Sequence, residues 1–279
     1  MLNLSGKGIG SSGVKRLADS CCFSRPEKVL WRQDSYQSPL VCLWLENDHL
    51  HASSAEDLAR LISVSPSLRH LHLGHNSLGN DGARIVSRAC FAQVQVCNLT
   101  DNEIGPTGAR MLAETLKDPS CTIQTLVLDS NHLRDEGVME IVGGLKSNTS
   151  LKSLDLRYNG ITRRGLLALR EVFRSGENMT LHTLDLEEDE DEGCLPTSPA
   201  QRPLQPKHKC SQQTCSCDRC RIKADTDFFL ALNRAGRHSF ANLDLSPALW
   251  SRILAKQSSH ENLSLIHAAL RERPDIAMH

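Results

Sequence analysis

Residues 68–83 have the sequence LRHLHLGHNSLGNDGA, and the same pattern returns as VQVCNLTDNEIGPTGA (94–109), IQTLVLDSNHLRDEGV (123–138) and LKSLDLRYNGITRRGL (151–166). One asparagine recurs in every copy at spacings of 26, 29 and 28 residues: Asn76, Asn102, Asn131 and Asn159. Self-similarity at a period of this length is typical of chains that stack one small structural unit many times. We therefore predict a repeat solenoid, a fold that leaves little room for a buried catalytic cleft.

Each copy changes its hydrophobic period halfway along. The first half alternates, which predicts a short strand with Leu71 and Leu73, or Cys97 and Leu99, pointing inward. The asparagine follows at the turn, where its side chain can bond backbone groups that would otherwise be buried without partners. The second half has helical spacing and begins with a small residue that allows close packing: Gly82, Gly108, Gly137 or Gly165.

The pattern extends in both directions from these four copies. Residues 40–58 form one upstream copy and residues 2–17 another, separated by an insertion at about 19–39. Downstream, Leu181, Leu184 and Leu186 begin a further strand that runs into an acidic segment. We therefore predict about seven strands, stacked in the order of the sequence.

This period of about 28 residues, with a helix in every unit, resembles the ribonuclease-inhibitor subtype of leucine-rich repeats. NOD-like receptors and the Ran GTPase-activating protein share this subtype, and the resemblance covers residues 1–186. It implies an α/β fold class: a curved leucine-rich repeat solenoid with parallel strands on the concave side and helices on the convex side. A small helical tail is expected after the solenoid. The chain lacks a GxxxxGK(S/T) motif, so we do not expect a complete NOD-like receptor.

Three regions are expected along the chain. Residues 1–186 form the solenoid, and residues 187–221 form an acidic, Pro- and Cys-rich linker in which positions 187–192 are all acidic. Residues 222–279 regain helical spacing. This last region forms either a small bundle or a cap on the last repeat.

The concave side of such a solenoid is the expected binding surface, because strand positions between the inward leucines point outward there. Trp44 and Tyr158 are aromatic residues of the kind enriched at interface hot spots. Acidic residues dominate the C-terminal half, which predicts a protein partner with a basic patch. The predicted protein-binding residues are Trp44, Glu46, His70, His72, His75, Asn98, Asp101, Asp129, Asp155, Arg157, Tyr158 and Asp185.

Four cysteines, Cys210, Cys215, Cys217 and Cys220, lie within eleven residues after the acidic segment. Close thiolates can hold a zinc ion, and the Cys217–Cys220 spacing suits chelation. The alternative is a cluster of unpaired, redox-labile thiols. His70, His72 and His75 form a second cluster, but no cysteine or carboxylate at metal-binding spacing accompanies them. Apart from this zinc, no cofactor is expected.

Bulk properties narrow the class of function. A net charge of −1 over 279 residues does not indicate binding to nucleic acid or to an anionic membrane. No apolar run approaches the roughly 20 residues that span a bilayer. The N-terminus lacks the layout of a signal peptide, and 11 cysteines are then expected to be reduced in the cytoplasm, or in the nucleus. The sequence leaves the oligomeric state open.

The motifs favour a non-enzymatic scaffold or adaptor, since no nucleophile–base arrangement or phosphate loop is present. Two alternatives remain open. One is a small-GTPase regulator resembling the Ran GTPase-activating protein, with Arg134, Arg163 or Arg164 in strand-to-helix loops. The other is a ubiquitin-ligase substrate receptor that uses residues 240–279, because LSPALWSRIL (245–254) resembles the LPxxLxxxIL opening of an F-box.

Overall fold

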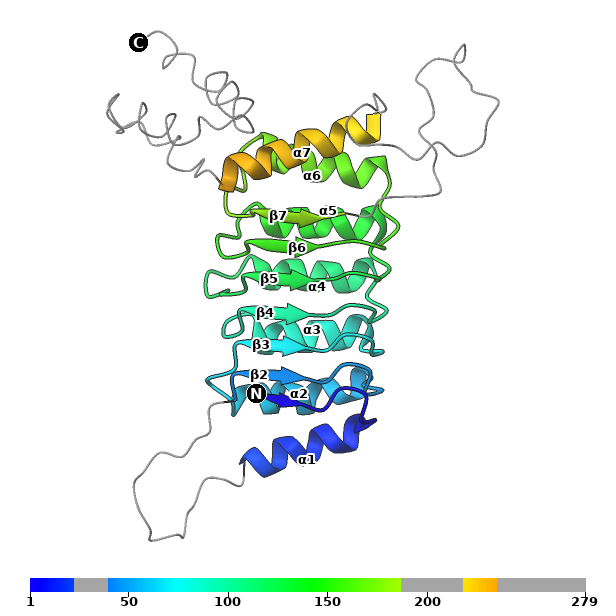
Figure 1. Ribbon diagram of the computed structural model, residues 1–279, viewed down its shortest axis with the longest axis vertical. Helices are drawn as coiled ribbons and strands as arrows, with labels where there is room; N and C mark the ends of the chain where they lie inside the picture. The colour runs from blue at the N-terminus through cyan, green and yellow to red at the C-terminus, as the bar shows by residue number, and fades with distance from the viewer. Residues whose placement is uncertain (23–39, 187–217, 235–279) are drawn as a thin grey trace, which may run out of the picture.

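A computed structural model describes residues 1–22, 40–186 and 218–234. Seven parallel strands form one sheet in sequence order, with helices along the opposite side (Figure 1). The strands are β1 (Leu2–Asn3), β2 (Cys42–Trp44), β3 (His70–His72), β4 (Val96–Asn98), β5 (Thr125–Val127), β6 (Ser153–Asp155) and β7 (Thr183–Asp185). The helices are α1 (Gly10–Cys22), η1 (Ala52–Ser54), α2 (Ala55–Ser63), α3 (Gly79–Cys90), α4 (Pro106–Leu116), α5 (Arg134–Leu145), α6 (Arg163–Arg174) and α7 (Asp218–Arg234).

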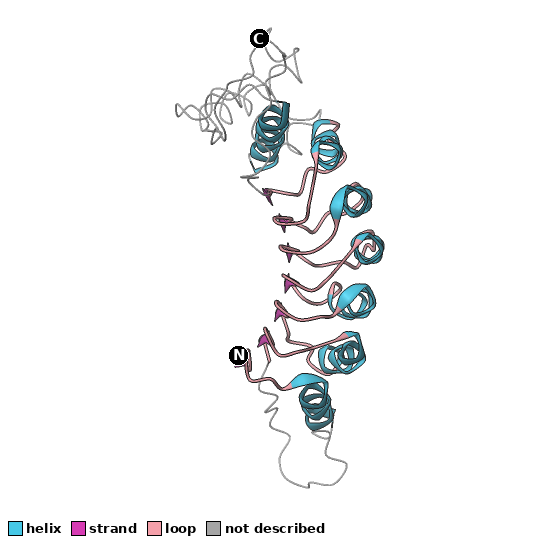
Figure 2. Ribbon diagram, turned by 90° about the vertical axis from the view of Figure 1, so that its right-hand side faces the viewer, coloured by secondary structure: helices cyan, strands magenta, loops and turns pink. Residues whose placement is uncertain are grey.

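The stack of repeats is curved, and the strands line its concave side while α1 to α6 cover the convex side (Figure 2). Equivalent positions of neighbouring repeats pair directly, for example Leu71 with Cys97 and His72 with Asn98. The predicted inward residues of the four central strands, from Leu71 to Leu156, are fully buried. The predicted α/β solenoid is therefore confirmed.

The small residue at the start of a repeat helix leaves room for a side chain from the preceding helix. Asn80 of α3 accepts the backbone N–H groups of Gly105 and Gly108 through Oδ1, each at 2.9 Å. A Cβ on Gly108 would lie 2.6 Å from that oxygen, which no real contact allows. Asp135 of α5 holds Gly165 in the same way, at 3.0 Å. Each of these two side chains thus caps the helix of the next repeat.

A ladder of asparagines joins the turns that follow the strands. Asn131 donates through Nδ2 to three carbonyls, those of Leu99, Leu128 and Asp129, at 2.9–3.1 Å. Asn76 and Asn159 donate in the equivalent way, and all four repeat asparagines are at least nine-tenths buried. The ladder satisfies backbone groups of two successive repeats at once, as predicted from the turn position.

Asp48 replaces asparagine at this position in the first complete upstream repeat. Its Oδ1 accepts the N–H groups of Lys7, Gly8 and Ile9 at 2.8–3.4 Å. Its Oδ2 is buried and has no hydrogen-bond partner within the described part of the chain. The side chain is fully buried. A carboxylate cannot donate to a carbonyl as the asparagines do, so this step of the ladder is incomplete.

The C-terminal end of the solenoid is covered by α7, which packs on α6 and β7. Ile222 and Leu230 are buried against the last repeat, and Asn233 donates to the carbonyls of Asn178 (3.3 Å) and Leu181 (2.9 Å). The helix begins at Asp218, four residues before the start expected from the sequence. It therefore caps the last repeat. The helices expected after Arg234 lie outside the described residues.

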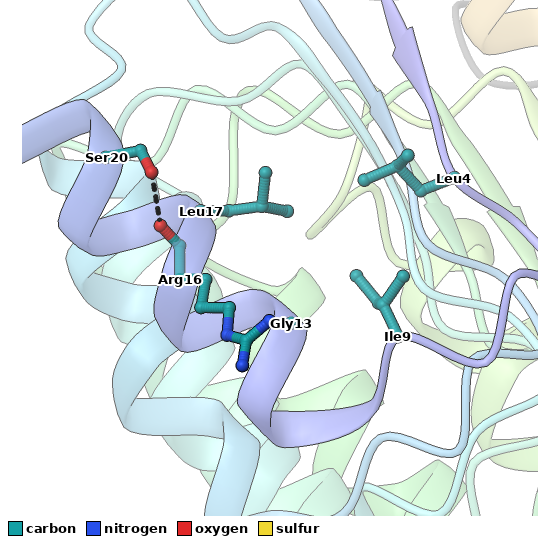
Figure 3. A pocket seen from close by; sticks show the side chains of 6 residues that line it. All are labelled: Leu4, Ile9, Gly13, Arg16, Leu17 and Ser20. Carbon is teal, nitrogen blue, oxygen red and sulfur yellow. Dashed lines mark hydrogen bonds between the residues drawn. The ribbon is translucent and has the colours of Figure 1, made fainter.

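The N-terminal end is more open. A cavity of about 200 Å³ lies between β1 and α1 and is lined mainly by Leu4, Ile9 and Leu17, with Arg16 and Ser20 at its rim (Figure 3). Leu2 and Leu4 are only partly buried, although they occupy the positions that are fully buried in the central repeats. The expected insertion begins inside α1, which continues to Cys22; residues 23–39 lie outside the described residues.

Candidate protein-binding surface

A stacked aromatic pair stands on the concave face near its N-terminal end. The rings of Trp44 and His72 have centroids 3.7 Å apart and an interplanar angle of 6°. The pair exists because β2 and β3 align these residues directly opposite each other. Trp44 also donates through Nε1 to Cys42 Sγ at 2.8 Å, so its ring is held from two sides.

Polar groups surround this pair. Asn98 donates through Nδ2 to Glu46 Oε1 at 3.2 Å, and His72 Nδ1 lies 3.8 Å from the same oxygen. Burial lowers the pKa of His72, and the charge of His70 lowers it further. A lowered pKa favours the neutral imidazole, which suits a ring that stacks on tryptophan and is partly buried. The result is a firmly held aromatic surface with a carboxylate beside it.

The acidic C-terminal half of the face contains its own counter-ion. Arg157 donates through Nε to both oxygens of Asp155, at 3.0 and 3.1 Å, and through Nη2 to Oδ2 at 2.6 Å. The hydrogen bonds and charge of Asp155 raise the pKa of Arg157, and the charges of Asp129 and Asp185 raise it further. Asp155 is only 7% exposed, because Arg157 lies over its carboxylate. Asp129 and Asp185 remain available for a partner.

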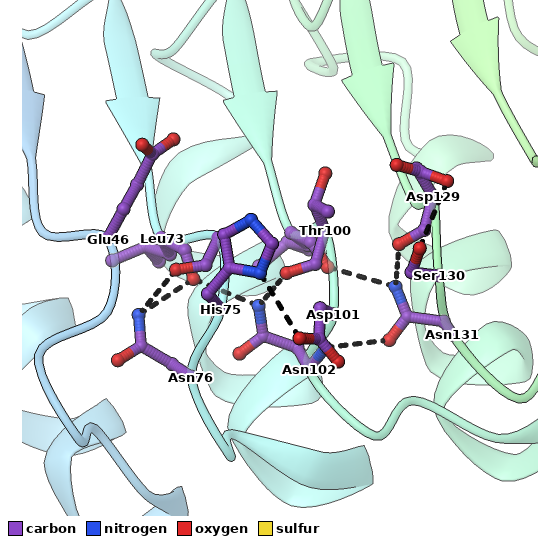
Figure 4. Close-up of polar contacts among 12 residues, drawn as sticks. Glu46, Leu73, His75, Asn76, Thr100, Asp101, Asn102, Asp129, Ser130 and Asn131 are labelled. Atoms are coloured by element: carbon purple, nitrogen blue, oxygen red, sulfur yellow. Dashed lines mark hydrogen bonds and ion pairs between the residues drawn. The ribbon is translucent and has the colours of Figure 1, made fainter.

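The residues that follow the strands at equivalent positions of successive repeats form the rim of the concave face. Its members share a left-handed backbone with φ between 49° and 56°: Asn47, His75, Asp101, Ser130 and Tyr158. This conformation follows from the sharp turn after each strand, and Asn, Asp and His tolerate it best. Tyr158 is 59% exposed, and His75 Nδ1 lies 3.1 Å from Asp101 Oδ2 (Figure 4). The structure thus gathers most of the predicted binding residues on one face and its rim.

The same rim contains three residues that the sequence analysis missed, His49, His51 and Glu103. Together with His75 and Asp101 they line a cleft of about 430 Å³, completed by Asn47, Asn76 and Ser77. The signal was available in the repeat register, because His49 and Glu103 follow Asn47 and Asp101 by two residues, with positive φ at all four positions. We refer to this feature as the rim cleft.

The predicted metal residues fall into two groups. His70 and His72 lie on one face of β3, whereas His75 is bonded to Asp101 at the rim. Over residues 1–22, 40–186 and 218–234, no three His, Cys, Asp or Glu side chains come together as a metal-binding group. Cys210, Cys215 and Cys217 lie outside the described residues, and only the backbone of Cys220, in α7, is described. Zinc binding there stays a prediction.

The alternative functions concern other parts of the chain. Arg134 and Arg163 are the first residues of α5 and α6, and both are exposed, as is Arg164. Residues 240–279, which the ubiquitin-ligase alternative needs, lie outside the described residues. Both alternatives stay predictions.

Comparison with known proteins agrees with the repeat geometry. The family described as Leucine Rich repeat matches residues 64–84, 98–113, 120–142 and 147–169. The chain is a leucine-rich repeat protein. Its repeats are of the ribonuclease-inhibitor type, as the sequence predicted.

Several curated relatives support this assignment. Ribonuclease inhibitor from Sus scrofa is 26% identical over 199 residues, which cover 60% of this chain and 41% of that protein. NACHT, LRR and PYD domains-containing protein 12 from Mus musculus is 32% identical over 173 residues, covering 62% of this chain and 13% of that protein. NACHT, LRR and PYD domains-containing protein 3 from Homo sapiens is 29% identical over 218 residues, which cover 67% of this chain and 20% of that protein. The chain therefore spans less than half the length of these relatives.

Among solved structures, leiomodin-1 actin-binding site 2 aligns with a TM-score of 0.42 and 18% identity, over 57% of this chain and 76% of that one. None of the helices in the described ranges is both long and apolar enough to cross a membrane.

Proposed function

We propose that this chain is a non-enzymatic scaffold that binds another protein along the concave face of its solenoid. The observation that carries the proposal is the Trp44–His72 stack, an aromatic pair held on an otherwise polar, accessible strand surface. Aromatic side chains with fixed orientation lose little conformational entropy on binding and dominate interface energetics. One relative is named for inhibiting a ribonuclease, which is itself a protein, and this supports the same kind of role.

The chemistry of the partner follows from the two ends of the face. Near Trp44 the surface offers aromatic area with Glu46 beside it, and near Arg157 it offers Asp129 and Asp185. Three aspartates and one arginine at that end leave a negative balance, so a basic patch on the partner is complementary. Because Arg157 already neutralises Asp155, attraction depends on Asp129 and Asp185 more than the sequence suggested.

The compartment is part of the proposal. Cys42, Cys90, Cys97 and Cys121 carry free thiols, and burial raises the pKa of Cys90 well above its ordinary value. Free thiols are the usual state of cysteine in the cytoplasm and nucleus. We place the protein there.

Affinity capture with matched variants tests the proposal. Immobilised wild-type protein, Trp44→Ala and Arg110→Ala are compared, with each captured protein quantified by mass spectrometry. Arg110 is exposed on α4 of the convex side and serves as the control. A partner retained by wild type and Arg110→Ala, but reduced about tenfold or more by Trp44→Ala, supports the concave face, as expected for a hot-spot aromatic. Equal retention by all three would place binding elsewhere.

A second pair of variants tests the charge argument. Asp185→Asn removes an exposed carboxylate from the concave face, whereas Asp155→Asn removes one that Arg157 covers. We expect Asp185→Asn to weaken capture at low salt and to have little effect at high salt. Asp155→Asn releases Arg157 and makes the end less negative by the same formal charge. Capture that is insensitive to both variants would remove the basic-patch requirement but leave the Trp44 result intact.

A further inference from the structure

The rim cleft lies where the turns after β2, β3 and β4 meet. It has three imidazoles, His49, His51 and His75, and two carboxylates, Asp101 and Glu103. These residues come from three successive repeats, so the cleft exists only because the repeats stack. Its volume of about 430 Å³ lies within the range of ordinary ligand pockets.

The charges of the cleft are unbalanced. No lysine or arginine is among its lining residues. His75 contacts Asp101 at 3.1 Å, whereas Glu103 is exposed and forms no ion pair within the described part of the chain. A cationic group that entered the cleft would therefore find an uncommitted carboxylate beside a second carboxylate with one histidine contact.

The residues that line the cleft favour one kind of cationic group over others. A metal ion is disfavoured, since no three of these side chains are placed to hold one within the described residues. An ammonium group would gain charge pairing and hydrogen bonds, but it has no flat surface that stacks on a ring. A guanidinium group pairs with carboxylates through a planar fork of donors and also stacks on flat rings, which the three imidazoles supply.

We propose that the rim cleft binds an arginine side chain presented by a protein partner. The inference rests on the proposed function in one respect, that the arginine belongs to a protein lying along the concave face. Asn47 of the cleft follows Glu46 directly in the chain, and Glu46 lies beside His72 of the aromatic stack. A partner that contacts the stack can therefore place one side chain over the rim and into the cleft.

The test uses a small probe and needs no knowledge of the partner. N-acetyl-arginine amide is titrated into the whole protein while histidine ring signals are followed by ¹H–¹³C NMR. The signals are assigned with the variants His49→Gln, His51→Gln and His75→Gln. N-acetyl-citrulline amide, which has nearly the same shape but no charge, is the matched control. We expect saturable shifts at His49, His51 and His75 with the arginine probe, and affinity about tenfold weaker with citrulline, because pairing with both exposed carboxylates is lost.

Two variants locate the effect. Asp101→Asn combined with Glu103→Gln should weaken the arginine probe about tenfold, because both exposed carboxylates are neutralised. Glu136→Gln, an exposed carboxylate at the start of α5, should leave binding unchanged. His182, which precedes β7 and lies three strands beyond β4, is remote from the cleft and should not shift.

Equal affinity for the citrulline probe, or for the double variant, would overturn the inference, as would shifts of His182 as large as those of His49. The citrulline comparison uses wild-type protein, so it holds even if a variant misfolds. The outcome is also separate from the capture experiment, because Trp44→Ala reports on the concave face whether or not the cleft binds arginine.

Discussion

Asn131 accepts the backbone N–H of Asn102 through its Oδ1 at 3.1 Å, so the asparagine side chain of one repeat bonds the backbone of the equivalent asparagine in the preceding repeat. The same oxygen accepts the N–H of Ile104 at 2.9 Å. Successive repeats are thus linked by buried polar bonds as well as by packed leucines. This linkage makes the repeats interdependent, since the loss of one asparagine leaves backbone groups of two repeats without partners.

The first prediction concerns this ladder. Asn131→Ala removes two accepted and three donated hydrogen bonds in a buried turn. We expect the free energy of unfolding to fall by about 3 kcal/mol, because several buried backbone groups lose their partners. Urea denaturation measures this as a lower midpoint. Asn3→Ala is the matched control: Asn3 is exposed and its side chain accepts one local bond, so about 0.5 kcal/mol or less is expected. Equal effects of the two variants would contradict a structural role for the ladder.

The second prediction is a stabilising substitution. Asp48 occupies an asparagine position, and its buried Oδ2 has no partner within the described residues. Asp48→Asn keeps an acceptor for Lys7, Gly8 and Ile9 and adds an amide that can donate to carbonyls, as Asn76 donates to Leu45 and Leu73. We expect a gain of about 1 kcal/mol in the free energy of unfolding, the size of one net hydrogen bond. Chemical denaturation at neutral pH would detect it, and a loss of stability would show that the charge at this site is needed.

The third prediction concerns the cap. Asn178 donates to the carbonyl of Asn148 at 3.2 Å, and Asn233 of α7 donates in the equivalent way to the carbonyl of Asn178 at 3.3 Å and also to that of Leu181. Asn233→Ala should destabilise α7 by about 1 kcal/mol, since two donated bonds are lost while one unpartnered buried oxygen is also removed.

Hydrogen exchange of the α7 amides measures the effect of Asn233→Ala directly. Asp225→Asn removes only the half-exposed ion pair with Arg170 and should change exchange much less. Unchanged exchange in Asn233→Ala would contradict the prediction and would mean that the apolar contacts of α7 hold it without these hydrogen bonds.

The sequence predicted the inward leucines, the asparagine ladder and the strand order because these features repeat with the period of the fold. Trp44 and His72 occupy equivalent positions in adjacent repeats, so even their proximity followed from the register. The ion pair between Arg157 and Asp155 could not be predicted from the sequence. It depends on the rotamer of a long side chain, which the repeat pattern does not fix.

The contacts at the C-terminal end of the solenoid and at its rim could not be predicted from the repeat pattern either. The sequence left open whether residues 222–279 form a bundle or a cap; within the described part of this region, Ile222, Leu230 and Asn233 of α7 are buried against the last repeat. The rim cleft was missed because His49, His51 and Glu103 lie two or more residues past Asn47 or Asp101, in turns whose side-chain directions the alternating strand pattern does not predict.

The last prediction concerns pH. The pKa of His72 lies below its ordinary value because burial against Trp44 disfavours the charged ring and His70 adds repulsion, although Glu46 lies close enough to oppose both effects. A group whose pKa is lowered on folding binds fewer protons in the folded state than in the unfolded state. The stability it contributes is therefore complete above its unfolded pKa of about 6.5 and is lost as pH falls toward the folded value.

NMR titration of the His72 ring should give a midpoint below 6.5. In Trp44→Ala the ring is uncovered, so the midpoint should rise, whereas Arg110→Ala should leave it unchanged; a wild-type midpoint at or above the ordinary value would show that Glu46 outweighs burial.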